Sequence, residues 1–145
     1  MTAPLIAYTD GGSRGNPGPA GFGVRIETAD GVLVAELQGS LGLATNNVAE
    51  YRGLIAALSW LVDAGHADVT VRSDSELLVK QMRGEYRVKH ANLQPLHAEA
   101  QRLVGRLGRV RFEHVRRESN RDADRLANLA MDEAAQSAPP GASGA

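Results

Sequence analysis

The sequence predicts an α/β fold with a five-stranded mixed sheet, in which an antiparallel meander and parallel strands are covered by helices on both faces. Three observations support this. The first forty residues alternate apolar and polar side chains, which is typical of half-buried strands. Further along, segments with helical spacing of apolar residues alternate with two short strand-like runs. A meander followed by strand-helix-strand crossovers produces a mixed sheet with helices on its faces.

The first three strands are expected over residues 5–10, 21–28 and 32–40. The last two are joined by Ala29-Asp30-Gly31, and an Asp-Gly pair between alternating apolar runs is a strong hairpin signal. Between the first two strands the sequence YTDGGSRGNPGPAGFGV is rich in glycine, which predicts a turn directly after Asp10. These segments form the antiparallel part of the sheet.

A long helix follows the meander. Its apolar side chains recur every three or four residues on one face, at Tyr51, Leu54, Ile55, Leu58, Leu61 and Val62. Asn47 is the expected N-cap, with Glu50 three residues later as in a capping box, and Gly65 is the expected stop.

The second half of the chain alternates short strands with helices. Strands are expected over residues 69–73 and 109–115. Ser75 is expected to cap a short helix, and a longer helix carries apolar residues between positions 93 and 107. The last helix is expected over residues 121–135.

The composition fits one globular domain, which we expect over residues 1–135 of the 145 in the chain. Residues 136–145 are rich in Ala, Gly, Pro and Ser and are expected to form a disordered tail or a linker. The chain has no cysteine, which excludes disulfides and thiolate zinc sites and fits the cytoplasm. No signal peptide is recognised, and no apolar run has the length of a membrane helix.

The net charge of −1 conceals an uneven distribution. Residues 72–125 contain 13 Lys and Arg against 8 Asp and Glu, whereas the rest of the chain contains 3 against 9. Such a basic segment is typical of a nucleic-acid-binding face, and it is equally compatible with a solvated helix surface.

Four acidic residues stand where strands end or helices begin. Asp10 ends the first strand and Asp74 follows the fourth, so their carboxylates meet at one sheet edge if these strands are parallel neighbours. Glu50 and Asp124 lie in the first turns of two predicted helices. Taken singly, each acid is more typical of a cap or a solvated turn. Together, four ionised carboxylates require cations, and oxygen ligands favour Mg²⁺ or Mn²⁺, two of which form a clamp for phosphodiester hydrolysis.

Four sequence blocks resemble, in order, those of the type 1 ribonuclease H family: YTDGGSRGNPGPAGFGV, TNNVAEYRGLIAAL, VRSDSELLVKQM and RESNRDADRLANLA. The resemblance covers roughly residues 4–135. It implies the ribonuclease H-like fold and a site in which Asp10, Glu50, Asp74 and Asp124 hold two Mg²⁺ ions, with Mn²⁺ as a substitute. It also implies cleavage of the RNA strand of RNA–DNA hybrids, leaving 5′-phosphate and 3′-hydroxyl ends. Asp122 lies on the other side of the helix turn and is not expected to bind metal.

The resemblance further implies a set of nucleic-acid contacts. Asn16, Asn46 and Asn47 are expected at the minor groove and the RNA backbone. Thr45 and Asn120 are expected in a pocket for a DNA phosphate. Each of these residues could instead be a plain helix cap, because Asn47 and Asn120 both stand where caps belong.

The sequence departs from the family pattern in two places. The long basic protrusion of many members is absent, and only residues 84–91 connect the second and third helices, so weaker and more salt-sensitive hybrid binding is expected. In this segment Tyr86 either packs on the DNA strand or covers the core. A flexible-loop histidine is also missing. Arg117 is expected to hold a phosphate in its place, whereas His114, which continues the alternation of its strand, is expected to be structural.

Two rival interpretations are a non-catalytic hybrid-binding module and another polynucleotidyl transferase of the same fold. The presence of all four acids argues against the first, because binding alone favours losing their mutual repulsion. The Thr-Asn-Asn and Asn-Pro-Gly elements fit ribonuclease H better than the second. The expected partner is an RNA–DNA hybrid and the expected state is a monomer. The linker-like ending is compatible with a fused C-terminal domain.

Overall fold

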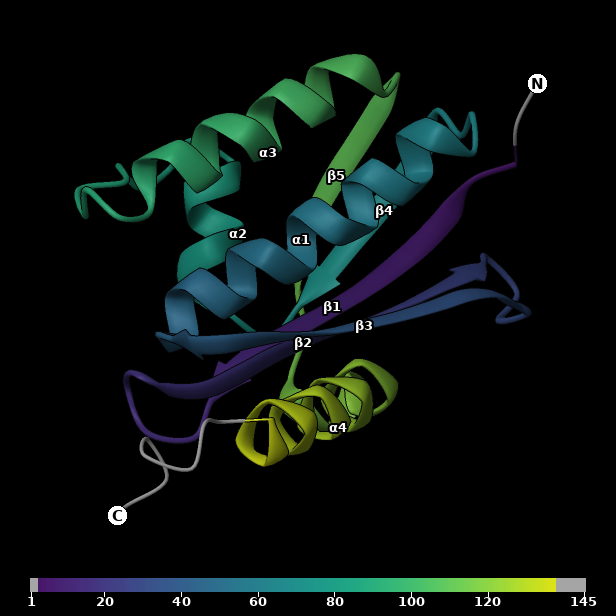
Figure 1. Cartoon of the computed structure of the whole chain (residues 1–145). Helices are drawn as coiled ribbons and strands as arrows, with labels where there is room; N and C mark the ends of the chain where they lie inside the picture. The colour runs from purple at the N-terminus through teal and green to yellow at the C-terminus, as the bar shows by residue number, and fades with distance from the viewer. Residues whose placement is uncertain (1–2, 138–145) are drawn as a thin grey trace, which may run out of the picture.

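A five-stranded sheet lies between two unequal layers of helices (Figure 1). The structure is a computed structural model and describes residues 3–137. Its elements are β1 Leu5–Ser13, β2 Gly18–Thr28, β3 Leu33–Ala44, α1 Asn46–Asp63, β4 Asp68–Ser73, α2 Glu76–Met82, α3 Gln94–Arg106, β5 Arg109–His114, the 3₁₀ turn η1 Arg117–Ser119 and α4 Arg121–Gln136.

The strands are ordered β3-β2-β1-β4-β5. β1, β2 and β3 pair antiparallel, whereas β4 pairs in parallel with both β1 and β5. The predicted fold class, an antiparallel meander extended by parallel strands, is therefore confirmed. The parallel arrangement of β1 and β4 is also the condition under which Asp10 and Asp74 were expected to meet.

The helices divide unequally between the two faces of the sheet. α1, α2 and α3 lie on one side, and α4 lies alone on the other, against β1, β2 and β3 (Figure 1). The main core is between α1 and the sheet, where Tyr51, Leu54, Leu58 and Leu61 are at most 1% exposed. The helical spacing in the sequence thus identified the buried face of α1 correctly.

Two glycines let helices approach the sheet at backbone distance. Gly11 continues β1, and a Cβ atom there would lie 2.3 Å from the carbonyl carbon of Ala49 in α1. Gly23 in β2 has the same relation to α4, because a Cβ atom there would lie 2.3 Å from the carbonyl oxygen of Ala123. Both distances are far shorter than a van der Waals contact, so only glycine fits at these two positions without moving a helix.

The glycine-rich segment therefore lies largely within β1 and β2, and the first three strands are longer than predicted. β1 runs to Ser13 rather than to Asp10, β2 begins at Gly18 rather than at residue 21, and β3 runs to Ala44 rather than to residue 40. The prediction failed because glycine in a sequence usually indicates a turn. Here its small size serves close packing between strand and helix.

One predicted helix cap is confirmed and one is wrong. The Ser75 hydroxyl accepts a hydrogen bond from the backbone of α2 at 3.3 Å, as expected. α1 is capped by Thr45, whose Oγ1 accepts from the Val48 backbone N–H at 3.2 Å, and Asn47 lies inside the first turn. The Asn47 capping box is therefore wrong, and Glu50 has no capping role.

α4 ends at Gln136, close to the predicted end of the domain. The tail was predicted over residues 136–145; residue 136 belongs to α4, and residues 138–145 lie outside the described residues. In the described part of the chain, residues 3–137, no helix combines the length and the apolar character needed to cross a membrane.

Candidate active site

Three acids meet at the carboxyl edge of the parallel strands. The parallel pairing of β1 with β4 ends at Thr9 and Ser73, so Asp10 and Asp74 come next on two adjacent strands. Glu50 reaches the same edge from the beginning of α1. Carboxylate oxygen atoms of Asp10, Glu50 and Asp74 all lie within 4.8 Å of one another.

Asp124 joins these acids from the opposite face of the sheet. It lies in the first turn of α4 and lines the same hollow as the other three. We call this hollow the acidic cavity. Besides the four acids, its polar lining includes Arg14, Asn46, Arg117 and Asn128. The structure thus brings together the four acids that the sequence singled out, from three different layers of the fold.

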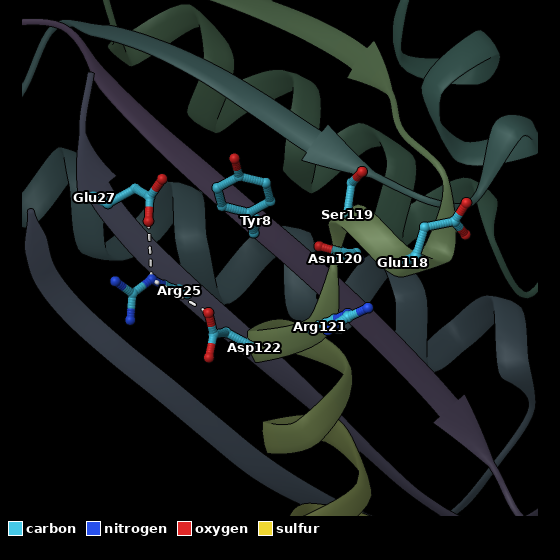
Figure 2. A pocket seen from close by; sticks show the side chains of 8 residues that line it. All are labelled: Tyr8, Arg25, Glu27, Glu118, Ser119, Asn120, Arg121 and Asp122. Carbon is cyan, nitrogen blue, oxygen red and sulfur yellow. Dashed lines mark hydrogen bonds and ion pairs between the residues drawn. The ribbon is translucent and has the colours of Figure 1, made fainter. Parts of the chain in front are cut away.

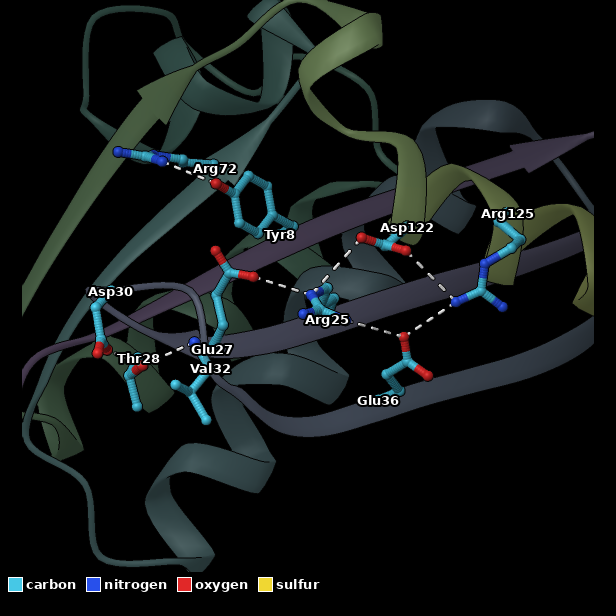
Figure 3. Close-up of polar contacts among 10 residues, drawn as sticks. All are labelled: Tyr8, Arg25, Glu27, Thr28, Asp30, Val32, Glu36, Arg72, Asp122 and Arg125. Carbon is cyan, nitrogen blue, oxygen red and sulfur yellow. Dashed lines mark hydrogen bonds and ion pairs between the residues drawn. The ribbon is translucent and has the colours of Figure 1, made fainter.

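Asp122 faces away from the acidic cavity, as predicted. Its carboxylate pairs with Arg25 at 3.7 Å and with Arg125 at 3.6 Å (Figure 3). Arg25 also pairs with Glu27 at 2.9 Å and with Glu36 at 3.6 Å. Arg25, Glu27 and Asp122 line a second hollow at the start of α4, where Arg25 pairs with both acids (Figure 2).

Burial and mutual repulsion raise the pKa values of the clustered acids. Burial, followed by the charge of Asp74 and the influence of Asp124, raises the pKa of Asp10 to about 8. Burial, followed by the charges of Asp10 and Asp74, raises the pKa of Glu50. Burial also raises the pKa of Asp74, although Arg117 opposes this shift. A cation among the carboxylates would favour their ionised forms.

An unpaired oxygen atom makes the site fit a metal ion. The Oε2 atom of Glu50 is buried and has no hydrogen-bond partner among residues 3–137. Leaving a buried carboxylate oxygen without a partner is costly, and coordination to a cation would satisfy it. Carboxylate oxygens are hard ligands, which suit Mg²⁺ and Mn²⁺. The acids of the cavity therefore fit divalent cations.

The raised pKa values predict how stability depends on pH when divalent ions are removed. Folded-state pKa values above the unfolded ones mean that the folded state holds more protons between about pH 4 and pH 8. The contribution of the cluster to stability is present at low pH and is lost as the pH rises through this window. Asp10→Asn removes one charge, so in EDTA it should raise the melting temperature at pH 8.5 and have less effect at pH 5.5.

Thermal melts of the wild type and Asp10→Asn at both pH values test this. We expect a gain of roughly 2–8 °C at pH 8.5, the range that about 1 kcal/mol produces in domains of comparable size. Mg²⁺ at pH 8.5 should then stabilise the wild type more than the variant. A gain that is equal at both pH values would contradict the repulsion described above.

Two basic side chains lie next to Asp74. Arg117, in η1, is 83% exposed, and its Nε atom lies 3.9 Å from Asp74 Oδ2. His114 is also exposed, at the end of β5, with Nε2 3.3 Å from the Asp74 carbonyl oxygen. His114 is thus the last residue of β5, as the alternation predicted, but its side chain is exposed because the core does not cover the end of the strand, and its structural role stays a prediction.

The residues expected at the minor groove connect the β1–β2 loop with the start of α1. The Asn16 side-chain oxygen accepts from the Asn46 backbone N–H at 3.0 Å, and the Asn46 side-chain oxygen accepts from the Ser13 backbone N–H at 2.8 Å. Asn47 is exposed beside them, and Thr45 caps the helix. Of these residues Asn46 lines the acidic cavity, and we call the three asparagines and Thr45 together the polar rim.

Asn120 does not lie on this rim. It is 1% exposed, and its Nδ2 atom donates to the Thr9 carbonyl oxygen at 2.9 Å. A side chain so deeply buried offers no surface to a phosphate, so the expected role in a DNA-phosphate pocket does not fit its position. Asn120 instead ties the start of α4 to β1, one residue before Asp10. This contact with β1 could not be predicted from the sequence, because an Asn that precedes a helix is ordinarily its N-cap.

Tyr86 is 48% exposed and does not cover the core. The Lys80 ammonium lies 4.9 Å from the centre of its ring and donates to its hydroxyl at 3.3 Å. The short segment between α2 and α3 therefore presents an aromatic ring beside a cation on the surface. The alternative that Tyr86 covers the core is therefore wrong, and its packing on a nucleic acid stays a prediction.

The sheet order, the single helix on one face and the acidic cavity together define a domain with the ribonuclease H-like fold. A model of the family described as reverse transcriptase-like matches residues 8–130. Ribonuclease H of Chromohalobacter salexigens is 38% identical over an alignment of 146 residues that covers 89% of this chain and 85% of that protein. The chain belongs to the type 1 ribonuclease H family.

Solved structures agree with this assignment. The N-terminal RNase H domain of Rv2228c from Mycobacterium tuberculosis superimposes with a TM-score of 0.92 at 50% identity, covering 95% of this chain and 100% of that one. LC11-RNase H1, solved in complex with an RNA/DNA hybrid, superimposes with a TM-score of 0.85 at 45% identity, covering 90% and 98%.

Two curated relatives are longer than this chain. The bifunctional protein Rv2228c of M. tuberculosis is 52% identical over 135 residues, which are 92% of this chain and 37% of the relative. Ribonuclease HI of Halobacterium salinarum is 44% identical over 128 residues, which are 88% of this chain and 64% of the relative. The chain thus spans little more than a third of the mycobacterial relative.

Proposed function

We propose that the protein is an endoribonuclease that hydrolyses the RNA strand of RNA–DNA hybrids with two Mg²⁺ ions and leaves 5′-phosphate and 3′-hydroxyl ends. The observation that carries the proposal is the acid cluster with the buried, unpartnered Glu50 oxygen. A module that only binds hybrid has no use for such a cluster, because the repulsion among its members destabilises the fold.

Asp10, Glu50, Asp74 and Asp124 would hold the metal ions, for which Mn²⁺ would substitute. When bound, the ions lower the pKa of the attacking water and stabilise the charge that develops on the leaving oxygen. The protein contributes the placement of the acids on elements whose backbones are in direct contact at Gly11 and Gly23. It also contributes Arg117, whose guanidinium beside Asp74 can donate hydrogen bonds to a phosphate.

Substrate recognition is assigned to the polar rim and to the surface near α2. Asn16, Asn46 and Asn47 would contact the minor groove and the 2′-hydroxyls of the RNA strand, which distinguish RNA from DNA. Thr45 would donate to a phosphate of the DNA strand. Tyr86 would pack on the DNA strand next to Lys80. We propose that the protein acts as a monomer in the cytoplasm, and that a C-terminal domain is fused to it; the length and the bifunctional name of the mycobacterial relative, whose RNase H domain is N-terminal, support this.

The proposal is tested with end-labelled substrates in Mg²⁺: a continuous hybrid, duplex DNA of the same sequence, and a DNA duplex with a single ribonucleotide. We expect cleavage of the RNA strand in the hybrid alone, because several consecutive 2′-hydroxyls are required. Binding without cleavage would support the rival binding module. Cleavage of duplex DNA would support another polynucleotidyl transferase.

The role of Arg117 leads to a separate prediction. Arginine remains protonated at neutral pH, so it cannot act as a general base, but it can hold the scissile or the leaving phosphate. Arg117→Ala should lower the single-turnover rate roughly 10- to 100-fold, on the scale of one or two charge-assisted contacts in the transition state. Hybrid affinity should change less. Arg117→Lys should restore only part of the rate, because the planar fork is lost.

Arg116→Ala is the matched control, since it removes an exposed arginine of the same loop. It should leave the rate close to that of the wild type. A wild-type rate for Arg117→Ala would show that Arg117 is only a solvated partner of Asp74.

A further inference from the structure

Arg14 lines the acidic cavity, and nothing in the sequence pointed to it. It follows the last residue of β1, and its backbone is fixed because its N–H donates to the Pro19 carbonyl oxygen at 2.9 Å. The preceding residue, Ser13, is bonded to Asn46 on the polar rim. Arg14 therefore lines the acidic cavity next in sequence to a residue that is hydrogen-bonded to the polar rim.

The guanidinium of Arg14 is held against α4. It donates to the Asp132 carboxylate, and it reaches the carbonyl and side-chain oxygens of Asn128 at 3.4 and 3.5 Å. The side chain is nevertheless 44% exposed, and a guanidinium has five N–H donors, more than these three contacts use. A cation fixed in direction, half exposed and with donors to spare is suited to bind an anion from solution.

The position along α4 indicates which anion. Asp124, Asn128 and Asp132 follow one another at intervals of four residues on one face of the helix. Asp132 is about 12 Å from Asp124 along the helix axis, at about 1.5 Å per residue. The Arg14 guanidinium contacts Asn128 and Asp132, about 6 and 12 Å from Asp124 along the axis, so it faces a phosphate next to the one that Asp124 would act on. A nucleic-acid strand passing through the cavity carries further phosphates on either side of that one.

We propose that Arg14 binds a phosphate of the RNA strand that flanks the scissile phosphate, and that Asp132 orients the guanidinium as an oxygen acceptor while its negative charge competes with that phosphate. Arg117 and Arg14 then hold the strand from two sides, Arg117 beside Asp74 and Arg14 beside α4. This inference rests on the proposed function, because it assumes that the cavity receives an RNA–DNA hybrid.

The test measures binding of a fluorescent hybrid in Mg²⁺, in an Asp10→Asn background that prevents cleavage, across a range of salt concentrations. Arg14→Ala should weaken binding about 5- to 30-fold, as expected for the loss of a charge-assisted phosphate contact. It should also make the dependence of log affinity on log salt shallower by about 0.7–0.9, the value for one phosphate. Asp132→Asn keeps an oxygen acceptor for Arg14 and removes the competing charge, so it should strengthen binding about 2- to 5-fold.

The matched control is the exposed ion pair between Arg102 and Glu99 on α3, with contacts of 2.6 and 3.0 Å. Arg102→Ala and Glu99→Gln change the net charge by the same amounts and should leave affinity and salt dependence unchanged. If Arg14 and Asp132 form only a structural ion pair, both variants lose thermal stability and the salt dependence stays the same, which overturns the inference. A wild type that neither cleaves nor binds hybrid overturns the proposed function itself.

Discussion

Asp10→Asn should abolish cleavage of an RNA–DNA hybrid. A carboxylate oxygen of Asp10 lies within 4.8 Å of those of Glu50 and Asp74, and, besides burial and Asp74, the carboxylate of Asp124 also raises the pKa of Asp10. An amide is a neutral and weaker ligand for hard cations, so the variant loses the charge that would hold Mg²⁺ in the site. Metal ions supply several kcal/mol of transition-state stabilisation, which corresponds to a loss of about 10³-fold or more in single-turnover rate.

Asp74→Asn should behave in the same way, because Asp74 occupies the equivalent position on the neighbouring strand. Both variants should remain folded, as judged by circular dichroism, so that the loss cannot be ascribed to unfolding. EDTA should reproduce the loss in the wild type, and added Mg²⁺ or Mn²⁺ should reverse it. Cleavage by the wild type in EDTA would end the metal-dependent interpretation.

The second large effect separates two acids that are two residues apart on α4. Asp124→Asn should lower the single-turnover rate about 10²- to 10³-fold, because Asp124 lines the acidic cavity. Asp122→Asn should change the rate less than about threefold. Its ion pairs with Arg25 and Arg125 are half exposed, and such pairs contribute little to stability.

The two variants are matched in charge, in side chain and in helix, so their comparison reports position alone. Single-turnover cleavage of one labelled hybrid by both proteins is the measurement. Equal losses would mean that cleavage depends on the negative charge at the start of α4 and not on Asp124 as a metal ligand. A larger loss for Asp122→Asn would mean that α4 binds the substrate with the opposite face.

Much of the site could be predicted because the apolar runs of β1 and β4 and the starts of the helices are visible in sequence. The apolar run before Asp10 and the one before Asp74 place both acids at the same sheet edge once the strands are parallel. The helical spacing of apolar residues gives the face of α4 and thereby distinguishes Asp124 from Asp122. These features depend on local periodicity, which the fold does not override.

Other features depend on contacts between distant segments and could not be predicted. Asn120 is a residue type that often caps helices. It is buried and donates to the Thr9 carbonyl oxygen only because β1 packs against the start of α4. His114 continues the alternation of β5, but the core does not extend to this last residue of the strand. Arg14 appears in the sequence as part of a glycine-rich loop, and its role depends on α4, more than a hundred residues later.

The contacts at Gly11 and Gly23 have a consequence for how the protein can change over time. Gly11 touches α1 at the residue before Glu50, and Gly23 touches α4 at the residue before Asp124. Each helix is thus seated on the sheet by main-chain atoms next to the acid that it delivers, so the spacing of the acids is independent of neighbouring side-chain rotamers. A methyl group added at either glycine would push the helix away from the sheet, and the acid on that helix would move away from the other acids. Active lineages are therefore expected to vary freely on the surface of both helices while these two positions, which have no side chain, stay fixed.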